Sequence, residues 1–402
     1  MIEITAAALC AATLWILTRS GVAERAGRAP ALLLVAGASL SFAYRASGAP
    51  FLNADWVAAG ADALLAAIAF AAAAQFRVSR LAVHCPASFR LTLGGAPLFL
   101  IVCSLLAFML APPLAISSAF LLGGALMLNG AAFDRRAVIG APAPALIKAA
   151  VRLESAAIVA LGLPVVVLLE GAATAAPTGA PAVAPLYFAS LSAVKGFALG
   201  GVLGLVASSI GAKFFARKGA GAVAAIAAAA AYLASPMLGA SGLIAAVAAG
   251  LVWGEATPSL VTTRVKLRRA VETAVSPAAY FAFGALFAPR FFQGDLLLVV
   301  FAIAAITIIR VVPRLIALKS TSLPSEAQGF LAWFGGAPGA ASALYLISLF
   351  DATALVAQDT ILTAGALSVA GGVFAARATS RPLLRLLLKE MARSKKRAML
   401  SA

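Results

Sequence analysis

The stretch KAAVRLESAAIVALGLPVVVLLE, from Lys148 to Glu170, decides how the rest of the sequence is interpreted. It is almost wholly apolar and is long enough to cross a bilayer as a helix, which takes about 20 residues. A carboxylate, Glu154, lies inside it, next to Ser155. A charged side chain at the centre of a membrane helix costs about 2.5–3.5 kcal/mol on insertion scales. Glu154 therefore has either a partner of opposite charge or a functional role.

The composition of the whole chain is that of a polytopic membrane protein. Of its 402 residues, 63% are hydrophobic and only 11% are charged, and the mean hydropathy is +1.03. The surface of a soluble domain needs far more charge than this. The first apolar run, 2–18, has no basic stretch before it and no small-residue cleavage site after it. We expect it to be a retained helix and not a signal peptide.

Repeated apolar runs predict an all-α protein with about thirteen transmembrane helices. A transmembrane domain covers residues 1–376, and an uncharged Ala/Pro/Gly-rich connector near 171–184 divides it into two halves. We expect the basic, amphipathic tail at 377–402 to lie on anionic lipid, or alternatively to bind a partner. The expected spans are 2–18, 30–44, 56–76, 91–111, 113–133, 148–170, 185–212, 220–235, 236–253, 271–288, 295–318, 327–350 and 357–376.

The basic residues alternate between the loops in a way that predicts the orientation. If the loop after the first span is cytoplasmic, 27 of the 31 Lys and Arg residues fall on the cytoplasmic side. Cytoplasmic loops of membrane proteins carry such an excess of Lys and Arg. We therefore expect the N-terminus outside and the C-terminus in the cytoplasm. The net charge of +17 is assigned to orientation and not to nucleic-acid binding.

Two of the predicted spans carry helix breakers at mid-membrane. The pair Asn129-Gly130 interrupts one, and the run Gly335-Gly336-Ala337-Pro338-Gly339 interrupts the other. Proline removes a helical hydrogen bond and glycine weakens the helix. The freed backbone groups must face protein or a wet cavity. Interrupted helices in the two halves of a chain indicate a transporter's binding site. The alternative is that these small residues serve close packing of helices.

The sequence favours neither an enzyme nor a cofactor-binding protein. Its three cysteines, Cys10, Cys85 and Cys103, lack the spacing of metal ligands or of a disulfide framework. The single histidine, His84, stands in a basic loop. No nucleophile–base set and no phosphate-cradling loop is visible, so no metal and no cofactor is predicted.

Motifs along nearly the whole chain resemble those of one family. They are FRVSRLAVHCPASFRLTLGG, FLLGGALML, VRLES…LGLP, SGLIAAVAAGLVWG, IIRVVPRL, WFGGAPGAAS and ALSVAGGVFAA. They resemble the cation/proton antiporter superfamily, of the bacterial sodium/proton exchanger type. This resemblance implies inverted five-helix repeats, two crossed discontinuous helices and a homodimer. It also implies a secondary transporter in a bacterial inner (plasma) membrane that moves a small ion and protons.

The acids that bind the ion in that family are missing here. The family usually carries Thr-Asp where this chain has Gly130-Ala131, and Asn-Asp or two acids where it has Ile158-Val159. An arginine often stands in the family at the position of Pro338. The sequence still offers uncharged oxygens and freed backbone groups at the two breaks. The transport-site candidates are Asn129, Gly130, Ser155, Gly335, Gly336, Pro338, Gly339 and Ser342.

Four charged residues, Glu154, Arg310, Asp62 and Lys195, are candidates for a position inside the membrane. Glu154 and Arg310 match two residues that pair in the family's core, and two buried charges that satisfy each other are tolerated. A direct ion-binding role is the alternative for Glu154. Asp62 is expected to be an interfacial or paired acid. Lys195 snorkels towards water, receives an anionic substrate, or pairs with Asp62.

Three functions follow from this mixture of matches and departures. The first is a secondary transporter resembling monovalent cation (Na⁺ or K⁺)/proton antiporters, with a degenerate ion site. The second is a transporter of the same fold with a neutral or anionic substrate, since helix N-termini and intramembrane basic residues suit an anion. The third is a non-transporting pseudo-antiporter that serves as a membrane subunit or regulator.

Overall fold

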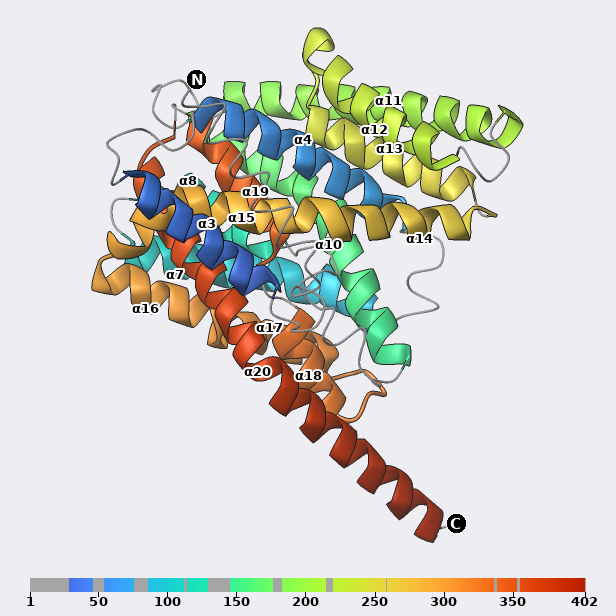
Figure 1. Cartoon of the computed structure of the whole chain (residues 1–402), viewed down its shortest axis with the longest axis vertical. Coiled ribbons are helices and arrows are strands. Elements are labelled where there is room, and N and C mark those ends of the chain that lie inside the picture. Colours follow the sequence, from blue (N-terminus) through green and yellow to red (C-terminus); the bar gives the residue numbers. More distant parts are fainter. Residues whose placement is uncertain are drawn as a thin grey trace.

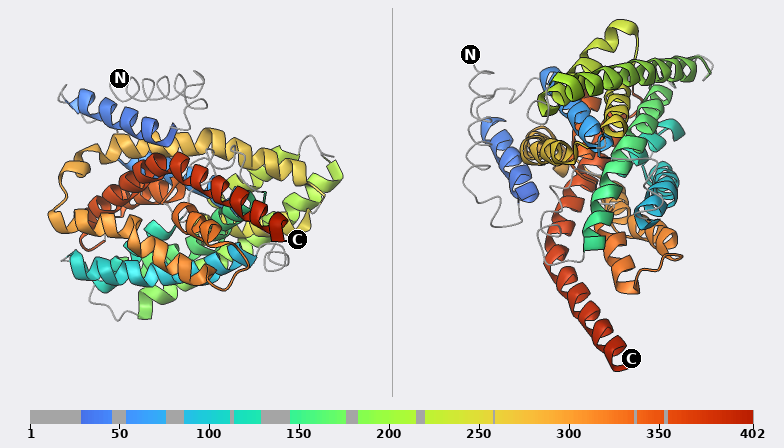
Figure 2. Two further views of the ribbon diagram at one scale, coloured as in Figure 1. Left: turned by 90° about the horizontal axis from the view of Figure 1, so that it is seen from below. Right: turned by 90° about the vertical axis from the view of Figure 1, so that its right-hand side faces the viewer.

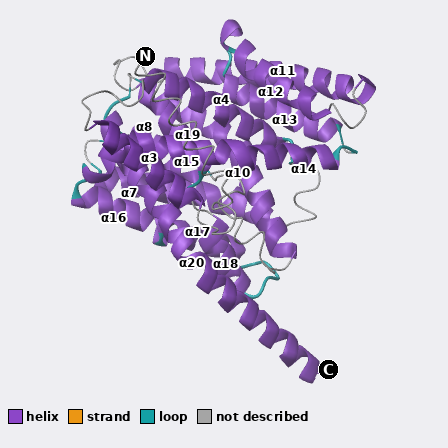
Figure 3. Cartoon of the chain, in the orientation of Figure 1, coloured by secondary structure: helices purple, strands orange, loops and turns teal. Residues whose placement is uncertain are grey.

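The structure is a bundle of helices. The computed structural model describes residues 29–45, 54–75, 86–111, 114–128, 145–175, 183–214, 220–257, 259–335, 338–352 and 355–401. Every secondary-structure element in these ranges is a helix (Figure 3). In chain order they are α3 (Ala29–Arg45), α4 (Ala54–Ala73), α6 (Pro86–Arg90), η1 (Leu91–Gly95), α7 (Ala96–Leu110), α8 (Ile116–Met127), α10 (Ala145–Ala175), α11 (Val183–Phe214), α12 (Ala220–Ala234), η4 (Pro236–Leu238), α13 (Gly242–Ala256), α14 (Val261–Ala270), η5 (Val271–Val275), α15 (Ser276–Phe287), η6 (Ala288–Phe292), α16 (Leu296–Ile306), α17 (Ile308–Leu318), α18 (Ser325–Gly335), α19 (Ala340–Ser348), η7 (Leu349–Asp351) and α20 (Gln358–Ser401).

The predicted class, an all-α polytopic membrane protein, is confirmed. In the described part of the chain, eight helices are long and apolar enough to cross a membrane. Three more apolar helices are shorter, and among them is α8, which we expected to be interrupted. The first predicted span, 2–18, lies outside the described residues, so the total of thirteen spans stays a prediction.

The helices form two groups that contact each other (Figure 1). In one group, α4, α11, α12 and α13 pack side by side, and α3 lies along α15. In the other, α7, α8, α10 and α16 to α20 pack together. The helices α10 and α19 belong to the second group but also contact α4 of the first. The candidate site described below is built from these connecting helices.

Glycine allows some of these helices to approach closely. A Cβ atom added at Gly200 of α11 would lie 2.1 Å from the carbonyl oxygen of Ala245 on α13. One added at Gly284 of α15 would lie 2.1 Å from the carbonyl oxygen of Leu34 on α3. Small residues at such contacts are typical of packing between membrane helices. The packing interpretation of glycine therefore holds at these two positions.

Several helices have bounds that differ from the sequence prediction. The helix α10 extends to Ala175, well into the expected connector. The basic segment at 261–270, expected as a loop, is the helix α14, which continues through the π-helical turn η5 into α15. The expected single span 295–318 is divided at Thr307, where the backbone leaves helical geometry (φ −112°, ψ −93°). For α14, the reason is that a helix can continue into the interface where its long basic side chains reach water.

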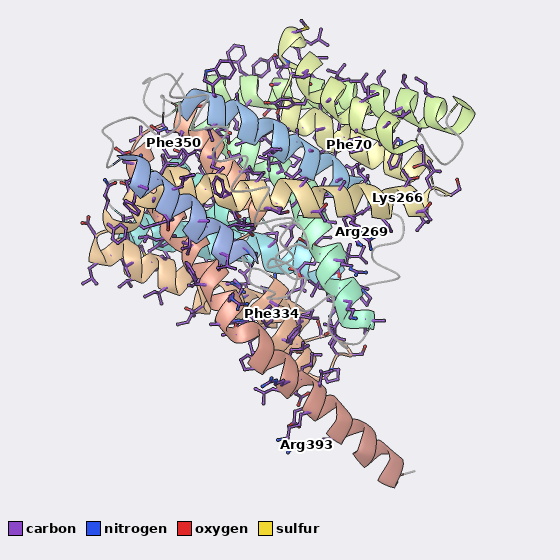
Figure 4. The ribbon with its side chains drawn as sticks, viewed as in Figure 1. Phe70, Lys266, Arg269, Phe334, Phe350 and Arg393 are labelled. Carbon is purple, nitrogen blue, oxygen red and sulfur yellow. The ribbon has the colours of Figure 1, made fainter. Side chains whose placement is uncertain are left out.

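The last helix has no boundary between the transmembrane domain and the tail. The helix α20 has 44 residues and runs without a break from Gln358 to Ser401. Its C-terminal part projects from the bundle (Figures 1 and 2), and Arg393 lies on this projecting part (Figure 4). Leu387, near its base, is buried in an apolar cluster with residues of α10 and α18. The start of the predicted tail therefore packs on protein, and the interaction of the remainder with lipid stays a prediction.

Candidate functional site

The predicted break in the span 327–350 is present. The helix α18 ends at Gly335 and α19 begins at Ala340. Gly339 has an extended backbone (φ −128°, ψ −158°), and Pro338 is buried. A Cβ atom added at Gly372 of α20 would lie 3.2 Å from Cδ of Pro338, so α20 packs closely against the break. Gly336 lies outside the described residues.

Arginine and glutamate form a buried ion pair at the end of α18. The Nη1 atom of Arg314, on α17, lies 2.5 Å from Oε1 of Glu154 on α10. The two side chains are 4% and 0% exposed. We expected Arg310 as the partner of Glu154, and the ion pair seen at this carboxylate is instead with Arg314. Arg310 and Arg314 lie one turn apart on the same face of α17, and the structure places Arg314 against the carboxylate.

The guanidinium group of Arg314 also satisfies backbone groups at the end of α18. Its Nε donates to the carbonyl of Ala332 at 3.0 Å and its Nη2 donates to that of Leu331 at 2.9 Å. The last carbonyls of a helix have no partner within the helix and carry partial negative charge. Arg314 thus neutralises both a carboxylate and a helix C-terminus. The carboxylate of Glu154 therefore already has a cationic partner within the protein.

Gly335 leaves the space that this ion pair occupies. A Cβ atom at position 335 would lie 1.6 Å from Nη2 of Arg314 and 2.5 Å from Oε2 of Glu154. No side chain fits there unless the ion pair moves. The first glycine of the Gly335–Gly339 run is therefore required by a charged contact as well as by the end of the helix.

Arg310 has a different environment. Its side chain is buried, with 1% exposure, and its Cζ atom lies 5.4 Å from the ring centroid of Trp333 on α18. The indole N–H of Trp333 donates to the hydroxyl of Thr379 on α20 at 2.8 Å. A guanidinium group at this distance from a tryptophan ring is attracted by its π-system. Arg310 therefore connects α17 to α18 and, through Trp333, to α20.

The end of α8 lies against the start of α19. The hydroxyl of Ser342, one turn into α19, donates to the carbonyl of Leu128, the residue at which α8 ends. A Cβ atom added at Gly162 of α10 would lie 2.9 Å from Cε of Met127. The ends of two predicted discontinuous helices and the middle of α10 therefore meet. Asn129 and Gly130 follow directly and lie outside the described residues.

The positions of the missing acids line the same region. Ile158 and Val159 on α10 are buried, and Cγ2 of Ile158 lies 3.9 Å from the Cβ position of Gly162. Ser155, one turn earlier, is also buried. The region thus combines carbonyl and hydroxyl oxygens with apolar side chains where the family resemblance leads one to expect carboxylates.

A second polar contact lies further along α10 and was missed in the sequence analysis. The hydroxyl of Tyr345, on α19, donates to Oε2 of Glu170 at 2.8 Å. The same hydroxyl lies 3.4 Å from the carbonyl of Val166. Asp62 of α4 is close enough for its charge to act on both Glu170 and Tyr345. Glu170 ends the apolar run and therefore resembles an ordinary charge at the end of a span.

Lys195 lies on α11 and points towards the turn that precedes α13. Its side chain is exposed, and its Nζ atom is 3.7 Å from the Cβ position of Gly239, in the turn between η4 and α13. This placement favours the snorkelling interpretation of Lys195. In the described residues, no group of three or more His, Cys, Asp or Glu side chains is arranged to hold a metal ion.

Comparison with known proteins gives the family. Residues 6–386 match the family described as sodium/hydrogen exchanger, transmembrane. No curated protein matches the chain significantly. The fold is similar to that of the sodium/proton antiporter MjNhaP1 from Methanocaldococcus jannaschii at pH 8, with a TM-score of 0.75, 17% identity, and coverage of 96% of this chain and 100% of that one. A second structure of MjNhaP1, from electron microscopy, gives a TM-score of 0.60 with 16% identity, and covers 81% of this chain and 84% of that one. Because the family match spans nearly the whole chain, the protein belongs to the transmembrane sodium/hydrogen exchanger family of antiporters.

Proposed function

We propose that this protein exchanges a monovalent cation, Na⁺ or K⁺, for protons and binds the cation where the end of α8 meets the start of α19. The family supports ion exchange, and the structurally similar MjNhaP1 is a sodium/proton antiporter. The observation that carries the proposal is the contact between the Ser342 hydroxyl and the carbonyl of Leu128. It brings the ends of two half-helices to one point, which is where transporters of this architecture bind their ions.

The electrostatics of the two helix ends favour a cation at α8. The C-terminus of a half-helix presents carbonyl oxygens, which coordinate hard cations such as Na⁺. The C-terminus of α18 is capped by Arg314, which donates to the carbonyl groups of Leu331 and Ala332. The C-terminus of α8 receives only a neutral hydroxyl group from Ser342 in the described residues. Of the two ends, the one at Leu128 is therefore the better cation ligand.

The site is degenerate because it has no carboxylate at the usual positions. Ile158 and Val159 replace the acids that the family carries, and the charge of Glu154 is neutralised by Arg314. Carbonyl and hydroxyl oxygens alone bind a monovalent cation more weakly than a site with a matched negative charge. We therefore expect a low cation affinity, and we expect proton exchange to depend on a carboxylate elsewhere in the protein.

Flux measurements on reconstituted protein test this proposal. Purified protein in liposomes that contain a pH-sensitive dye should move protons when a Na⁺ or K⁺ gradient is applied. Ser342→Ala should raise the cation concentration that gives half-maximal flux, because the contact at Leu128 is lost. Lys195→Gln, at an exposed position on α11, is the matched control and should leave this concentration unchanged. Folded protein that gives no cation-driven flux would refute the proposal and would favour a different substrate or a non-transporting subunit.

The oligomeric state, the orientation and the membrane of the protein are also proposals. We infer a homodimer, on the ground of the family resemblance. The distribution of Lys and Arg supports a cytoplasmic C-terminus. The family resemblance implies the inner membrane of a bacterium. Protease added to inside-out membrane vesicles should cleave the basic tail, and protease added to right-side-out vesicles should not. This comparison tests the orientation.

A further inference from the structure

An exchanger needs a group that binds and releases the transported proton. Glu154 does not meet this need, because its carboxylate is fully buried against Arg314. Its carboxylate lies 2.5 Å from the guanidinium group of Arg314, and breaking such a buried pair is strongly unfavourable. Any titrating carboxylate of the exchange cycle therefore lies elsewhere.

Glu170 has the surroundings that a titrating carboxylate requires. Glu170 is partly exposed, whereas Glu154 is fully buried. Its hydrogen-bond donor is the neutral hydroxyl of Tyr345 and not a cation. A neutral donor stabilises the ionised carboxylate less than an arginine does, so both protonation states remain accessible.

The position of Tyr345 allows a hydrogen-bond arrangement for each protonation state. When Glu170 is ionised, the Tyr345 hydroxyl donates to Oε2, as seen at 2.8 Å. When Glu170 carries a proton, its own O–H donates to the Tyr345 oxygen, and the tyrosine hydrogen turns to the carbonyl of Val166, 3.4 Å away. The same three groups therefore satisfy the carboxyl group before and after it takes up a proton.

Tyr345 also connects this contact to the proposed cation site. It lies on α19 three residues after Ser342, about 4.5 Å along the helix. Ser342 lies in the first turn of α19, where its hydroxyl contacts Leu128 at the end of α8. The helix that holds the cation ligand therefore also holds the hydrogen-bond partner of Glu170. A movement of α19 on cation binding would change the environment of the carboxyl group.

We infer that Glu170 is the carboxylate that takes up and releases the exchanged proton, and that Tyr345 is its positioning residue. The inference rests on the proposed exchange function. In one direction of the cycle, an aqueous proton binds the ionised carboxylate. In the other direction, the carboxyl O–H bond breaks and the proton returns to water on the opposite side.

Other charged or titratable groups act on Glu170 from neighbouring helices. The charge of Asp62 on α4 acts on it. Asp62 also acts on Tyr232 of α12. On α11, which also packs against α10, Lys195 extends towards Gly239.

The pH dependence of proteoliposome flux tests the inference. Glu170→Gln should abolish cation-driven proton flux. Tyr345→Phe should keep the maximal rate but move the half-maximal point of the pH profile to higher pH, since the ionised carboxylate loses a donor. Glu326→Gln removes an exposed acid at the start of α18 and should reproduce the wild-type profile. A purely structural role for Tyr345 would lower the rate without displacing the profile and would overturn that assignment.

A second readout separates this inference from the proposed function. Infrared difference spectra across a pH jump should show the carbonyl band of a protonated carboxyl group, and Glu170→Gln should remove it. Suppose that the wild-type protein shows cation-driven flux and that Glu170→Gln keeps both this flux and the carbonyl band. That result would overturn this inference and leave the proposed function standing. Wild-type protein without any cation-driven flux would overturn the proposed function and this inference with it. The thermal stability of each variant in detergent confirms that it is folded.

Discussion

The helix α10 carries two acids with opposite surroundings. Glu154 is fully buried against the guanidinium group of Arg314, which also holds the end of α18. Glu170, about 24 Å further along the helix, is partly exposed and accepts a hydrogen bond from a neutral tyrosine. The first acid has a cation as its partner and the second has a neutral donor. We infer that this difference makes Glu154 a structural acid and Glu170 a titrating one.

The largest expected effect is on the buried pair. Glu154→Ala and Arg314→Ala should each lower the free energy of unfolding by about 3–5 kcal/mol, because each leaves an uncompensated buried charge. The double variant should lose much less than the sum of the two. Unfolding in detergent, followed as a double-mutant cycle, measures this coupling. Additive losses for Glu154 and Arg314 would contradict the pairing.

A substitution at Gly335 should disturb the ion pair of Glu154 and Arg314 without removing either charge. Gly335→Ala places a methyl group on the ion pair and should cost about 1–3 kcal/mol of stability, as overpacking does in a close-packed core. Gly329→Ala, in the same helix, is the matched control because nothing lies within 4 Å of its Cβ position. It should be neutral or stabilise the protein by about 0.4–1 kcal/mol. Equal effects of the two substitutions would show that Gly335 is required only for the end of the helix.

Removing the contact between the two half-helices should have a smaller effect on stability. Ser342→Ala leaves the buried carbonyl of Leu128 without this donor and should cost about 1 kcal/mol or somewhat more. Ser348→Ala is the control within α19, since its hydroxyl bonds only to Tyr345 O in its own helix among the described residues. Thermal unfolding of the two variants compares them. A Ser342→Ala variant as stable as Ser348→Ala would show that the contact with α8 contributes nothing to stability.

The smallest effect is expected at an exposed ion pair. Arg290 contacts Asp359 at 2.8 Å, and the two side chains are 18% and 87% exposed. Arg290→Ala should change the stability by about 0.2–1 kcal/mol, since water screens exposed pairs, together with a small loss from its contact with the ring of Phe350. The loss should shrink at high salt. A loss as large as that of Arg314→Ala would mean that burial does not explain the difference between the two pairs.

The fold and the second break could be predicted because their signals are local. Apolar runs of membrane length require helices, and the Gly335–Gly339 run with its proline ends a helix in any surroundings. That Ile158 and Val159 stand where the family carries its acids stays a prediction, because it rests on the family resemblance alone.

The partner of Glu154 could not be predicted from the sequence, because the choice depends on packing. Arg310 and Arg314 lie on one face of α17, one turn apart. Only the position of α18 decides which of them reaches the carboxylate. The end of α18 places Arg314 at Glu154 and Trp333 over Arg310.

Glu170 was missed for a related reason. An acid at the end of an apolar run resembles a charge in the headgroup region. The structure extends α10 to Ala175 and brings Tyr345 to this carboxylate from 175 residues further along the chain. No local pattern in the sequence indicates a contact over such a separation.

The difference between the two acids is tested most directly by comparing the pH profiles of two variants. In one, Glu154→Gln and Arg314→Gln replace the ion pair with two neutral amides. In the other, Glu170→Gln removes the titrating carboxyl group. Cation-driven proton flux in liposomes should keep its wild-type pH profile in the first variant and disappear in the second. Loss of pH-dependent flux in the first, with an unchanged profile in the second, would show that Glu154 and not Glu170 carries the proton.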